Sequence, residues 1–222
     1  MQYYTADLHF FHPELCKVRG FAALEEMNES IVKNLSFLTE KDTLYILGDV
    51  AYGYTMDKDL DDIVSLLDRI RCTKHLITGN HDAWQLKNNP DIWKFKMRFA
   101  SINDSLLIRD SGYDLFLSHY PMLEWDGFYK GRWLFHGHIH EKATAGPGLL
   151  LELLPTAINI GYDLTGGART AEQLIEERKK TWKMPDFTFR DAVIPRMDPS
   201  LLNGKKGIIK TLSEFDALKD VL

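Results

Sequence analysis

The histidines of this chain gather in short polar blocks together with aspartate, asparagine and glycine. The blocks are Asp7-Leu8-His9, Gly48-Asp49, Gly79-Asn80-His81-Asp82, His119 and Gly137-His138-Ile139-His140. Carboxylate and amide oxygens are hard ligands and imidazole nitrogens are borderline ligands, a mixture that suits first-row divalent metal ions. Together the blocks predict a metalloenzyme that holds two such ions side by side.

The spacing within two of the blocks suits paired ligands. Side chains alternate between the two faces of a strand, so the first and third residues of an Asp-x-His block at a strand end point the same way. Asp7 and His9 are therefore expected to meet one ion, and His138 and His140 have the same spacing.

Two further blocks begin with glycine. Gly48 allows a tight turn from which the carboxylate of Asp49 projects, and its two oxygens are able to bridge two ions. The glycine before Asn80 likewise frees a turn that presents this residue as a carbonyl ligand. The imidazole of His81 is predicted to stay unligated as an acid or charge stabiliser, with Asp82 available to orient it.

Counting charges indicates the class of substrate. Two dications carry four positive charges, the carboxylates of Asp7 and Asp49 remove two, and neutral His and Asn ligands remove none. The bare site then carries about +2, and a bridging hydroxide, formed from water whose pKa a dication lowers toward about 7, leaves about +1. A phosphate ester matches that charge, so we expect hydrolysis of phosphate esters.

Apolar runs that end directly in the polar blocks must position these residues. The runs are 43–47, 75–78 and 115–118, which are followed by Gly48, Gly79 and His119. Short apolar runs are typical of buried strands, and the carboxyl ends of strands line the ligand crevices of α/β sheets. His75 and His136 also lie in such runs but match no ligand position, so we interpret both as structural.

Amphipathic helices are predicted between these strands. Apolar residues recur at helical spacing across 57–71, and acidic residues occupy its first turn, where the helix dipole favours them. Similar helices are expected over 24–38 and 170–182. The alternation of strand and helix indicates an α/β fold with the polar blocks along one rim.

The character of the chain changes near residue 165. Residues 1–165 contain all the polar blocks and are predicted to form the catalytic core, and 166–222 are predicted to be a helical and irregular appendage packed on it. The appendage includes a stretch broken by proline and glycine, followed by a capping-box pattern at Ser213. We expect that last helix to pack on the core, with a dimer or partner contact as the alternative.

Composition limits the class of protein. The chain has 222 residues, 45% hydrophobic content and a formal net charge of −5, which allows a full buried core and does not indicate a surface made for polyanions. Cys16 and Cys72 lack CxxC spacing and are expected to be reduced thiols of a cytoplasmic protein. No apolar run reaches membrane-spanning length, and the first block at Asp7 leaves no space for a signal peptide.

In order and spacing, the blocks Asp-x-His, Gly-Asp, Gly-Asn-His-Asp, His and Gly-His-x-His resemble the calcineurin-like metallophosphoesterase superfamily over residues 1–165. The chain is similar to the short single-domain bacterial and phage members, with Asp-x-His-Phe-x-His at Asp7 to His12. This resemblance implies a four-layer α/β/β/α sandwich of two mixed sheets flanked by helices. It also implies that one ion lies on Asp7, His9, Asp49 and His140 and the other on Asp49, Asn80, His119 and His138, with Asp49 as the bridge.

The same resemblance gives His81 a catalytic role, because it implies that this imidazole protonates the leaving oxygen or stabilises charge on the phosphoryl group. Members of the superfamily use manganese, iron, nickel or zinc, and the mixed ligand shell does not choose among them. Manganese is our first expectation. The chain departs from many relatives after Asp49, because it continues through Val50 and Ala51 to Tyr52 without a further acidic residue.

Residues beside the blocks are candidates for substrate binding, each with a structural alternative. His12, Arg19 and Tyr52 are placed to bind a second phosphate or a leaving group, or else to support the ligands. The aromatic segment 120–133 lies between two ligand blocks. Its Trp125 is a candidate to stack on a base, and the alternative is that it pins the segment to the core.

These observations favour a dinuclear-metal phosphodiesterase acting on a small nucleotide or a nucleic-acid end. A metal-dependent nuclease and a phosphomonoesterase are the alternative enzymes, and the acidic balance of the chain disfavours an extended nucleic-acid surface. A non-catalytic scaffold is the hypothesis from another class. It is disfavoured because every ligand position and His81 are present. The sequence leaves the natural substrate and the oligomeric state open.

Overall fold

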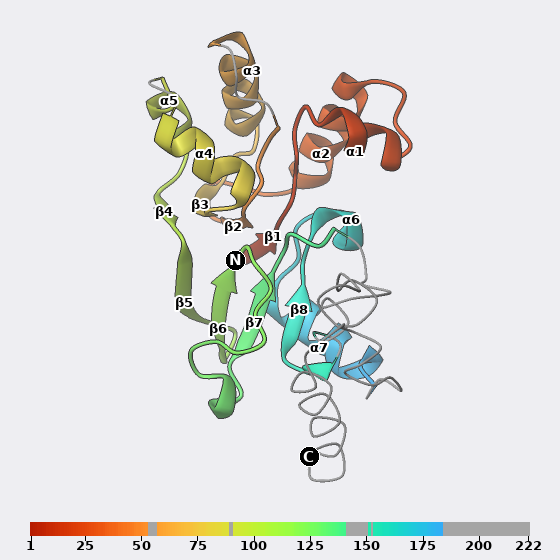
Figure 1. Cartoon of the computed structure of the whole chain (residues 1–222), viewed down its shortest axis with the longest axis vertical. Coiled ribbons are helices and arrows are strands. Elements are labelled where there is room, and N and C mark those ends of the chain that lie inside the picture. Colours follow the sequence, from red (N-terminus) through yellow and green to blue (C-terminus); the bar gives the residue numbers. More distant parts are fainter. Residues whose placement is uncertain (53–56, 89–90, 141–150, 152, 184–222) are drawn as a thin grey trace, which may run out of the picture.

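The computed structural model describes residues 1–52, 57–88, 91–140, 151 and 153–183 (Figure 1). In this part of the chain eight strands form two sheets. The strands are β1 (Gln2–Thr5), β2 (Thr43–Leu47), β3 (Thr73–Ile77), β4 (Ser101–Asn103), β5 (Ser105–Asp110), β6 (Tyr113–Ser118), β7 (Trp133–His136) and β8 (Ala157–Asn159). The first sheet has the order β1-β2-β3-β4 and the second β5-β6-β7-β8.

Helices occupy the connections between strands, as the alternating pattern predicts. They are α1 (Pro13–Val18), α2 (Leu24–Leu35), α3 (Asp57–Asp68), α4 (Asn80–Asn88), α5 (Trp93–Lys96), the 3-10 helix η1 (Phe128–Lys130), α6 (Tyr162–Thr165) and α7 (Ala171–Thr181). Figure 1 shows α1 to α5 beside the first sheet and α6 and α7 beside the second. The predicted α/β sandwich of two sheets flanked by helices is confirmed.

The two sheets differ in strand direction. The described strand pairs of the first sheet are all parallel. This sheet therefore differs from the expectation of two mixed sheets. The second sheet is mixed, because β5 and β6 are antiparallel while β6, β7 and β8 run parallel. Antiparallel strands need only a tight connection, and β5 is joined to β6 by the short turn at Ser111-Gly112.

Two apolar clusters account for the layers. α2 and α3 cover the first sheet with side chains at helical spacing, among them Met27, Ile31 and Leu67. A second cluster joins the two sheets and includes Tyr4 from β1 and Phe135 from β7. Removal of these apolar surfaces from water holds the layers together.

Residues beyond the predicted boundary at 165 contact the core directly. The backbones of Tyr4 and Arg169 exchange hydrogen bonds of 2.8 and 3.1 Å, and Leu174 and Ile175 of α7 belong to the cluster between the sheets. The boundary itself stays a prediction, and the helix predicted after Ser213 lies outside the described residues. Within the described part, no helix is long and apolar enough to cross a membrane.

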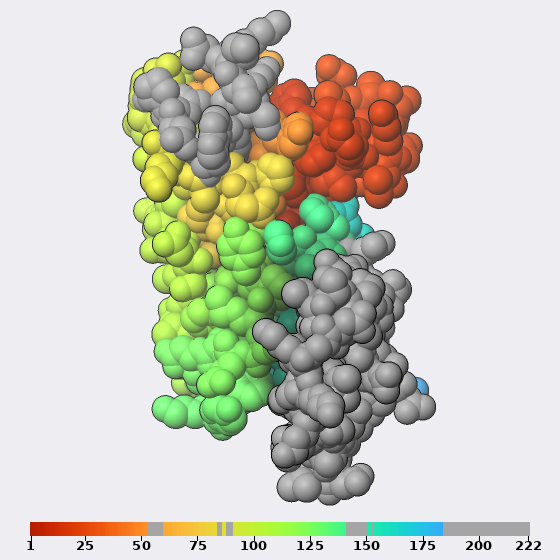
Figure 2. Space-filling view, viewed as in Figure 1, coloured from red at the N-terminus to blue at the C-terminus, as the bar shows by residue number. Residues whose placement is uncertain are grey.

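The parallel strands bring distant parts of the chain to one place. The carboxyl ends of β1, β2 and β3 meet at one edge of the first sheet, because parallel neighbours end on the same side. In the space-filling view, red residues of the N-terminal segment, yellow residues of α4 and green residues of the second sheet meet on one face (Figure 2). The polar blocks lie in the loops that leave these strands.

Candidate metal centre

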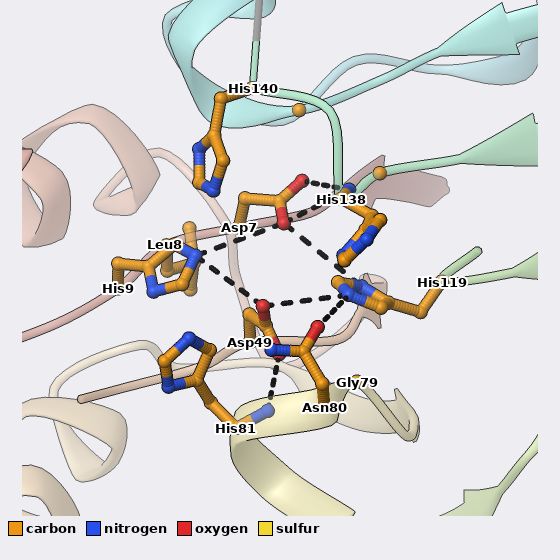
Figure 3. Close-up of polar contacts among 12 residues, drawn as sticks. Asp7, Leu8, His9, Asp49, Gly79, Asn80, His81, His119, His138 and His140 are labelled. Carbon is orange, nitrogen blue, oxygen red and sulfur yellow. Dashed lines mark hydrogen bonds and ion pairs between the residues drawn. The ribbon is translucent and has the colours of Figure 1, made fainter. Parts of the chain in front are cut away.

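Loops at the ends of five strands carry the candidate ligands, and their side chains turn toward a common centre (Figure 3). Asp7 follows β1, Asp49 follows β2, Asn80 follows β3, His119 follows β6 and His138 follows β7. The strand-end rule therefore brings together residues that are up to about 130 positions apart in the chain, as the 131-residue separation of Asp7 and His138 shows.

The ligand atoms form two groups. Those of Asp7, His9 and His140 lie within 4.8 Å of one another, and so do those of Asp49, His119 and His138. Figure 3 shows the two carboxylates between His9 and His140 on one side and His119 and His138 on the other.

One carboxylate oxygen is common to both groups. Oδ2 of Asp49 lies 3.5 Å from Nε2 of His9 and 3.4 Å from Nε2 of His119. The position of Asp49 suits a bridge between two ions. His138 and His140 fall into different groups, which is the division that the resemblance implied.

Hydrogen bonding around His119 supports a cation at this place. Nδ1 lies 2.8 Å from the carbonyl oxygen of Leu47, which only accepts, so Nδ1 carries the ring proton and Nε2 presents a lone pair. That lone pair faces Oδ1 of Asn80 at 3.1 Å and Oδ2 of Asp49 at 3.4 Å. Three acceptors that converge without a hydrogen between them repel one another unless a cation lies among them.

His9 gives a second, independent indication. Its side chain is 1% exposed, and neither ring nitrogen has a hydrogen-bond partner among the described residues. A buried polar atom without a partner costs about 1–3 kcal/mol. A metal ion on Nε2 would remove that cost for one of the two nitrogens.

Burial also shifts the ionisation of the ligands in a way that suits a metal. It raises the pKa of Asp7 to about 7, against a smaller opposing effect of the hydrogen bond from His138. It lowers the pKa of His119 to about 4 and lowers that of His9 further below its usual range. Burial therefore keeps the imidazoles of His9 and His119 neutral, as metal ligation requires, whereas the contact with Asp163 raises the pKa of His140.

The ligands do not sit in extended strands. The backbone is left-handed at five of them: Asp7 (φ 57°), His9 (φ 51°), Asp49 (φ 54°), His138 (φ 74°) and His140 (φ 30°). For a residue other than glycine this conformation costs roughly 1–2 kcal/mol, and such strain clusters at functional sites. Asp7 and His9 thus share one group as predicted, but through a left-handed loop and not through strand alternation.

His81 lies beside the two groups, at the start of α4. Its backbone N–H donates to Oδ1 of Asp49 at 2.9 Å, and its ring centroid is 5.0 Å from that of His9. His9, His12 and His81 also have ring nitrogens within 4.8 Å of one another. Nδ1 of His12 caps α1 through the N–H of Leu15 and also lies 3.3 Å from Oε2 of Glu14. A nitrogen occupied in this way is a poor ligand for a third ion.

Asp82, which follows His81 in the sequence, makes contacts that differ from those expected. The carboxylate of Asp82 is fully buried and accepts the backbone N–H groups of Asp49, Val50 and Gly79. It therefore joins the loop after β2 to the loop after β3. The prediction that this carboxylate orients the His81 ring stays a prediction.

Tyr52 and Arg19, the remaining candidates near the N-terminal blocks, are placed differently. The ring of Tyr52 lies 4.2 Å from that of His12 and is partly exposed beside His81. The guanidinium of Arg19 turns inward and donates to the carbonyls of Asp7 and Leu8, both at 2.8 Å. Tyr52 stays a candidate for substrate contact, whereas Arg19 supports the ligand loop, which was its structural alternative.

Trp125, a candidate for substrate binding, is buried in the structure. Its side chain is 5% exposed, its Nε1 donates to the carbonyl of Arg132 at 2.9 Å, and it packs on Phe128 and Leu134. It therefore pins the segment 120–133 to the outer face of the second sheet. A buried ring cannot present a face on which a base stacks.

Two residues near the centre were missed from the sequence. Tyr120 is 44% exposed, and its ring lies 5.0 Å from those of both His119 and His138. Asp163 contacts His140, with Oδ2 at 2.7 Å from Nδ1. Burial opposes the charge of Asp163, but hydrogen bonds from His140 and Arg19 hold its pKa below the usual value. The position of Asp163 just after the short strand β8 is the same signal that identified the other blocks.

Comparisons with known proteins give a family match and several likenesses to solved structures. A family model described as calcineurin-like phosphoesterase matches residues 3–142. A solved structure from Aquifex aeolicus, the protein of unknown function AQ665, is 22% identical, covers 80% of this chain and 98% of its own, and superposes with a TM-score of 0.61. That likeness supports the fold alone.

Two further solved structures are more distant. One is described as a novel archaeal phosphodiesterase; it is 17% identical, covers 78% of this chain and 94% of its own, and has a TM-score of 0.43. The other is Yfce, a phosphoesterase from E. coli; it is 16% identical, covers 72% and 77%, and has a TM-score of 0.37. No curated protein sequence matches the chain.

Proposed function

The chain belongs to the calcineurin-like phosphoesterase family and is a metal-dependent hydrolase of phosphate esters, and from this premise we propose that it is a phosphodiesterase for small nucleotides or nucleic-acid ends. The observation that carries the proposal is the pair of ligand groups that share Oδ2 of Asp49. An imidazole that belongs to neither group, that of His81, lies beside them.

The proposed ligand sets follow the two groups. Asp7, His9, Asp49 and His140 would hold one ion, and Asp49, Asn80, His119 and His138 the other. When bound, the ions would supply Lewis acidity and lower the pKa of a water molecule toward about 7, so that hydroxide is available near neutral pH. Manganese is our first choice among the ions that such a mixed shell accepts.

The protein's own side chains would handle the leaving group. The ring of His81 lies 5.0 Å from His9 and 6.0 Å from His12, measured between ring centroids. We assign to His81 the proton that the departing ester oxygen requires, or the stabilisation of charge on the phosphoryl group. His12 and Tyr52, which lie against each other, would contact the leaving group or a second phosphate.

Charge and shape favour a diester of modest size. With two dications and the two carboxylates of Asp7 and Asp49, the site carries about two positive charges before water binds, and about one once hydroxide is present. A phosphodiester carries one negative charge and a monoester up to two. Helices and strands of the core occupy much of the chain between the ligand blocks, so the described chain offers little material for the long groove of a protein phosphatase.

We also propose that the protein works in the cytoplasm. Cys16 and Cys72 are free thiols in the structure, Cys16 buried and Cys72 half-buried. Free thiols suit a reducing compartment.

The decisive experiment compares two chromogenic esters under manganese. We expect kcat/KM for bis(p-nitrophenyl) phosphate to exceed that for p-nitrophenyl phosphate. A strong preference for the monoester would contradict the diesterase assignment. The matched control is the Asp49→Asn variant, which keeps the shape of the bridging residue and removes its charge, and which should cleave neither ester.

The size of the natural substrate needs a second comparison. We expect a dinucleotide or a cyclic nucleotide to be cleaved faster than the interior of long single-stranded or duplex DNA. Rapid cleavage within long DNA would favour the nuclease alternative. Absence of any hydrolysis by the fully metal-loaded protein would favour the scaffold alternative.

A further inference from the structure

A chain of three side chains leads away from one of the two ligand groups. Nδ1 of His140 lies 2.7 Å from Oδ2 of Asp163, and Oδ1 of the same carboxylate accepts from Nε of Arg19 at 2.6 Å. The Arg19 side chain is 7% exposed. Asp163 lies on α6, beyond the residues 3–142 that match the family model.

The contact with Asp163 determines which nitrogen of His140 is available to a metal. An ionised carboxylate is only an acceptor, so Nδ1 of His140 must donate the hydrogen in this bond. The lone pair of the neutral ring is then on Nε2. A carboxylate behind a histidine ligand fixes its tautomer and ring orientation and raises its basicity.

Arg19 acts on the same group by a second path. Its Nη1 donates to the carbonyl oxygen of Leu8 and its Nη2 to that of Asp7. These carbonyls belong to the left-handed turn that aims Asp7 and His9. One guanidinium therefore holds the backbone of Asp7 and of Leu8, which precedes His9, and, through Asp163, the side chain of His140.

The other ligand group has different supports. His119 donates to the carbonyl of Leu47, and the loops that carry Asp49 and Asn80 are joined by Asp82. None of the hydrogen bonds described for Arg19 or Asp163 reaches His119, His138 or Asn80. Arg19 and Asp163 thus contact the first group alone, although the two groups share Asp49 and the backbone N–H of His138 donates to the Asp7 carboxylate.

We propose that Arg19 and Asp163 are positioning residues for one ion only, the ion held by Asp7, His9 and His140. The inference rests on the ligand sets given under the proposed function. It adds that changes at these two residues affect the affinity for one ion more than for the other, and that Asp163 of α6, which lies beyond the family match, completes the first of the two sites.

Metal titration tests this without any substrate. We would measure Mn²⁺ binding to the metal-free protein by isothermal titration calorimetry. The wild type should bind two ions. Asp163→Asn should bind one of them about 10–100-fold more weakly, the usual loss when the residue behind a metal ligand is changed, and the other within about twofold of the wild type. The matched control is Asp68→Asn, because Asp68 also accepts two hydrogen bonds from an arginine, Arg98, but touches no ligand.

A double-mutant cycle separates positioning from a general structural role. If Asp163 acts through its bond to His140, Asp163→Asn should weaken metal binding much less in a His140→Ala background than in the wild type. Equal losses in both backgrounds would overturn the inference for the Asp163–His140 contact. Equal weakening of both ions by Asp163→Asn alone would overturn it as well.

Two further measurements keep the test decisive. Circular dichroism of each metal-free variant shows whether it folds, and if Asp163→Asn does not, Arg19→Lys is titrated in its place, since lysine cannot bridge Asp163 and both carbonyls. The visible absorption spectrum of the Co²⁺-loaded Asp163→Asn variant should differ from that of the wild type in the contribution of one of the two bound ions. A wild type that binds fewer than two ions would contradict the proposed two-ion centre itself, and this inference with it.

Discussion

The carboxylate of Asp82 accepts the backbone N–H of Asp49 at 2.7 Å. The same carboxylate accepts the N–H of Val50 and of Gly79, so one buried group holds the loops after β2 and β3 in contact. Asp82 thereby positions Asp49, the residue that both ligand groups share. The Gly-Asn-His-Asp block contributes its last aspartate to the architecture of the centre.

Changing Asp82 should therefore cost stability even without metal. Asp82→Asn retains one acceptor oxygen but turns an amide N–H₂ toward a backbone donor, so at least one buried N–H loses its partner. We expect the free energy of unfolding of the metal-free protein, measured by urea denaturation, to fall by about 1–3 kcal/mol. The control is Asp61→Asn, which breaks an exposed pair with Lys94 and should change stability by less than about 0.5 kcal/mol. Equal effects of the two changes would contradict the clamp.

Gly48 is predicted to resist substitution for two separable reasons. Its φ of +83° is unfavourable for any residue with a side chain, and a Cβ there would collide with the His119 ring and lie 2.7 Å from Cα of Gly79. Gly112 has a φ of +84° with nothing within 4 Å. Gly112→Ala should therefore lose about 1–2 kcal/mol from the backbone alone, and Gly48→Ala about 1–3 kcal/mol more from overpacking. Thermal or urea unfolding measures both, and equal losses would show that the close contact is relieved at no cost.

Substitutions at His81 and Asp49 should affect turnover and metal content differently. His81→Asn removes the proposed proton donor and should lower kcat by about 10²–10⁴-fold, while elemental analysis still finds two ions. Asp49→Ala removes the ligand shared by both groups and should lose metal as well as turnover. Loss of metal from His81→Asn would move this residue from the chemistry into the ligand shell.

His75 provides a pH-dependent contribution to stability that is independent of the metal centre. Burial lowers its pKa from the usual 6.5, and Nδ1 contacts Oγ of Ser101 at 2.7 Å. As the pH falls below 6.5, the unfolded chain takes up the proton before the folded chain does, so the folded state loses stability through this group. We expect the wild type to lose more stability between pH 7.5 and pH 5.5 than His75→Gln does, as measured by urea unfolding at each pH. Parallel curves would contradict this.

The aromatic loop offers a contrast between a structural and a substrate-facing ring. Trp125→Phe removes the hydrogen bond to the carbonyl of Arg132 and should cost about 1 kcal/mol of stability with KM unchanged. Tyr120→Ala removes a ring that lies beside His119 and His138 and is partly exposed, and it should raise KM for the diester with little change in stability. A raised KM for Trp125→Phe would show that the buried ring affects substrate after all.

Much of the fold follows from local pattern. The apolar run 43–47 is a strand with the same bounds, and the strand expected at 75–78 runs from Thr73 to Ile77. The helix predicted over 57–71 ends at Asp68, because Arg69 and Ile70 close tighter turns onto Leu66 and Leu67. The predicted helix ends were less accurate than the helices themselves, because hydrophobic period reports which face is buried and not where the backbone leaves the helix.

The backbone conformation at the metal centre could not be predicted from local sequence pattern. Glycine is the residue that most readily adopts a left-handed backbone, yet Asp7, His9 and Asp49 also adopt it. The surrounding fold imposes that strain on them. For this reason the alternation of side chains along a strand does not describe the backbone at Asp7 and His9.

The sequence by itself determined most of the candidates for the chemistry, because ligand types at the ends of apolar runs gather at the carboxyl ends of the strands. Only the tertiary structure decided how they are grouped and supported. Arg19 and Asp163 are 144 residues apart, and Asp163 and His140 are 23 apart, so no local spacing relates them. Such contacts depend on how the ends of several strands and helices are packed together, and hence the positioning of each metal ligand is a property of the folded chain.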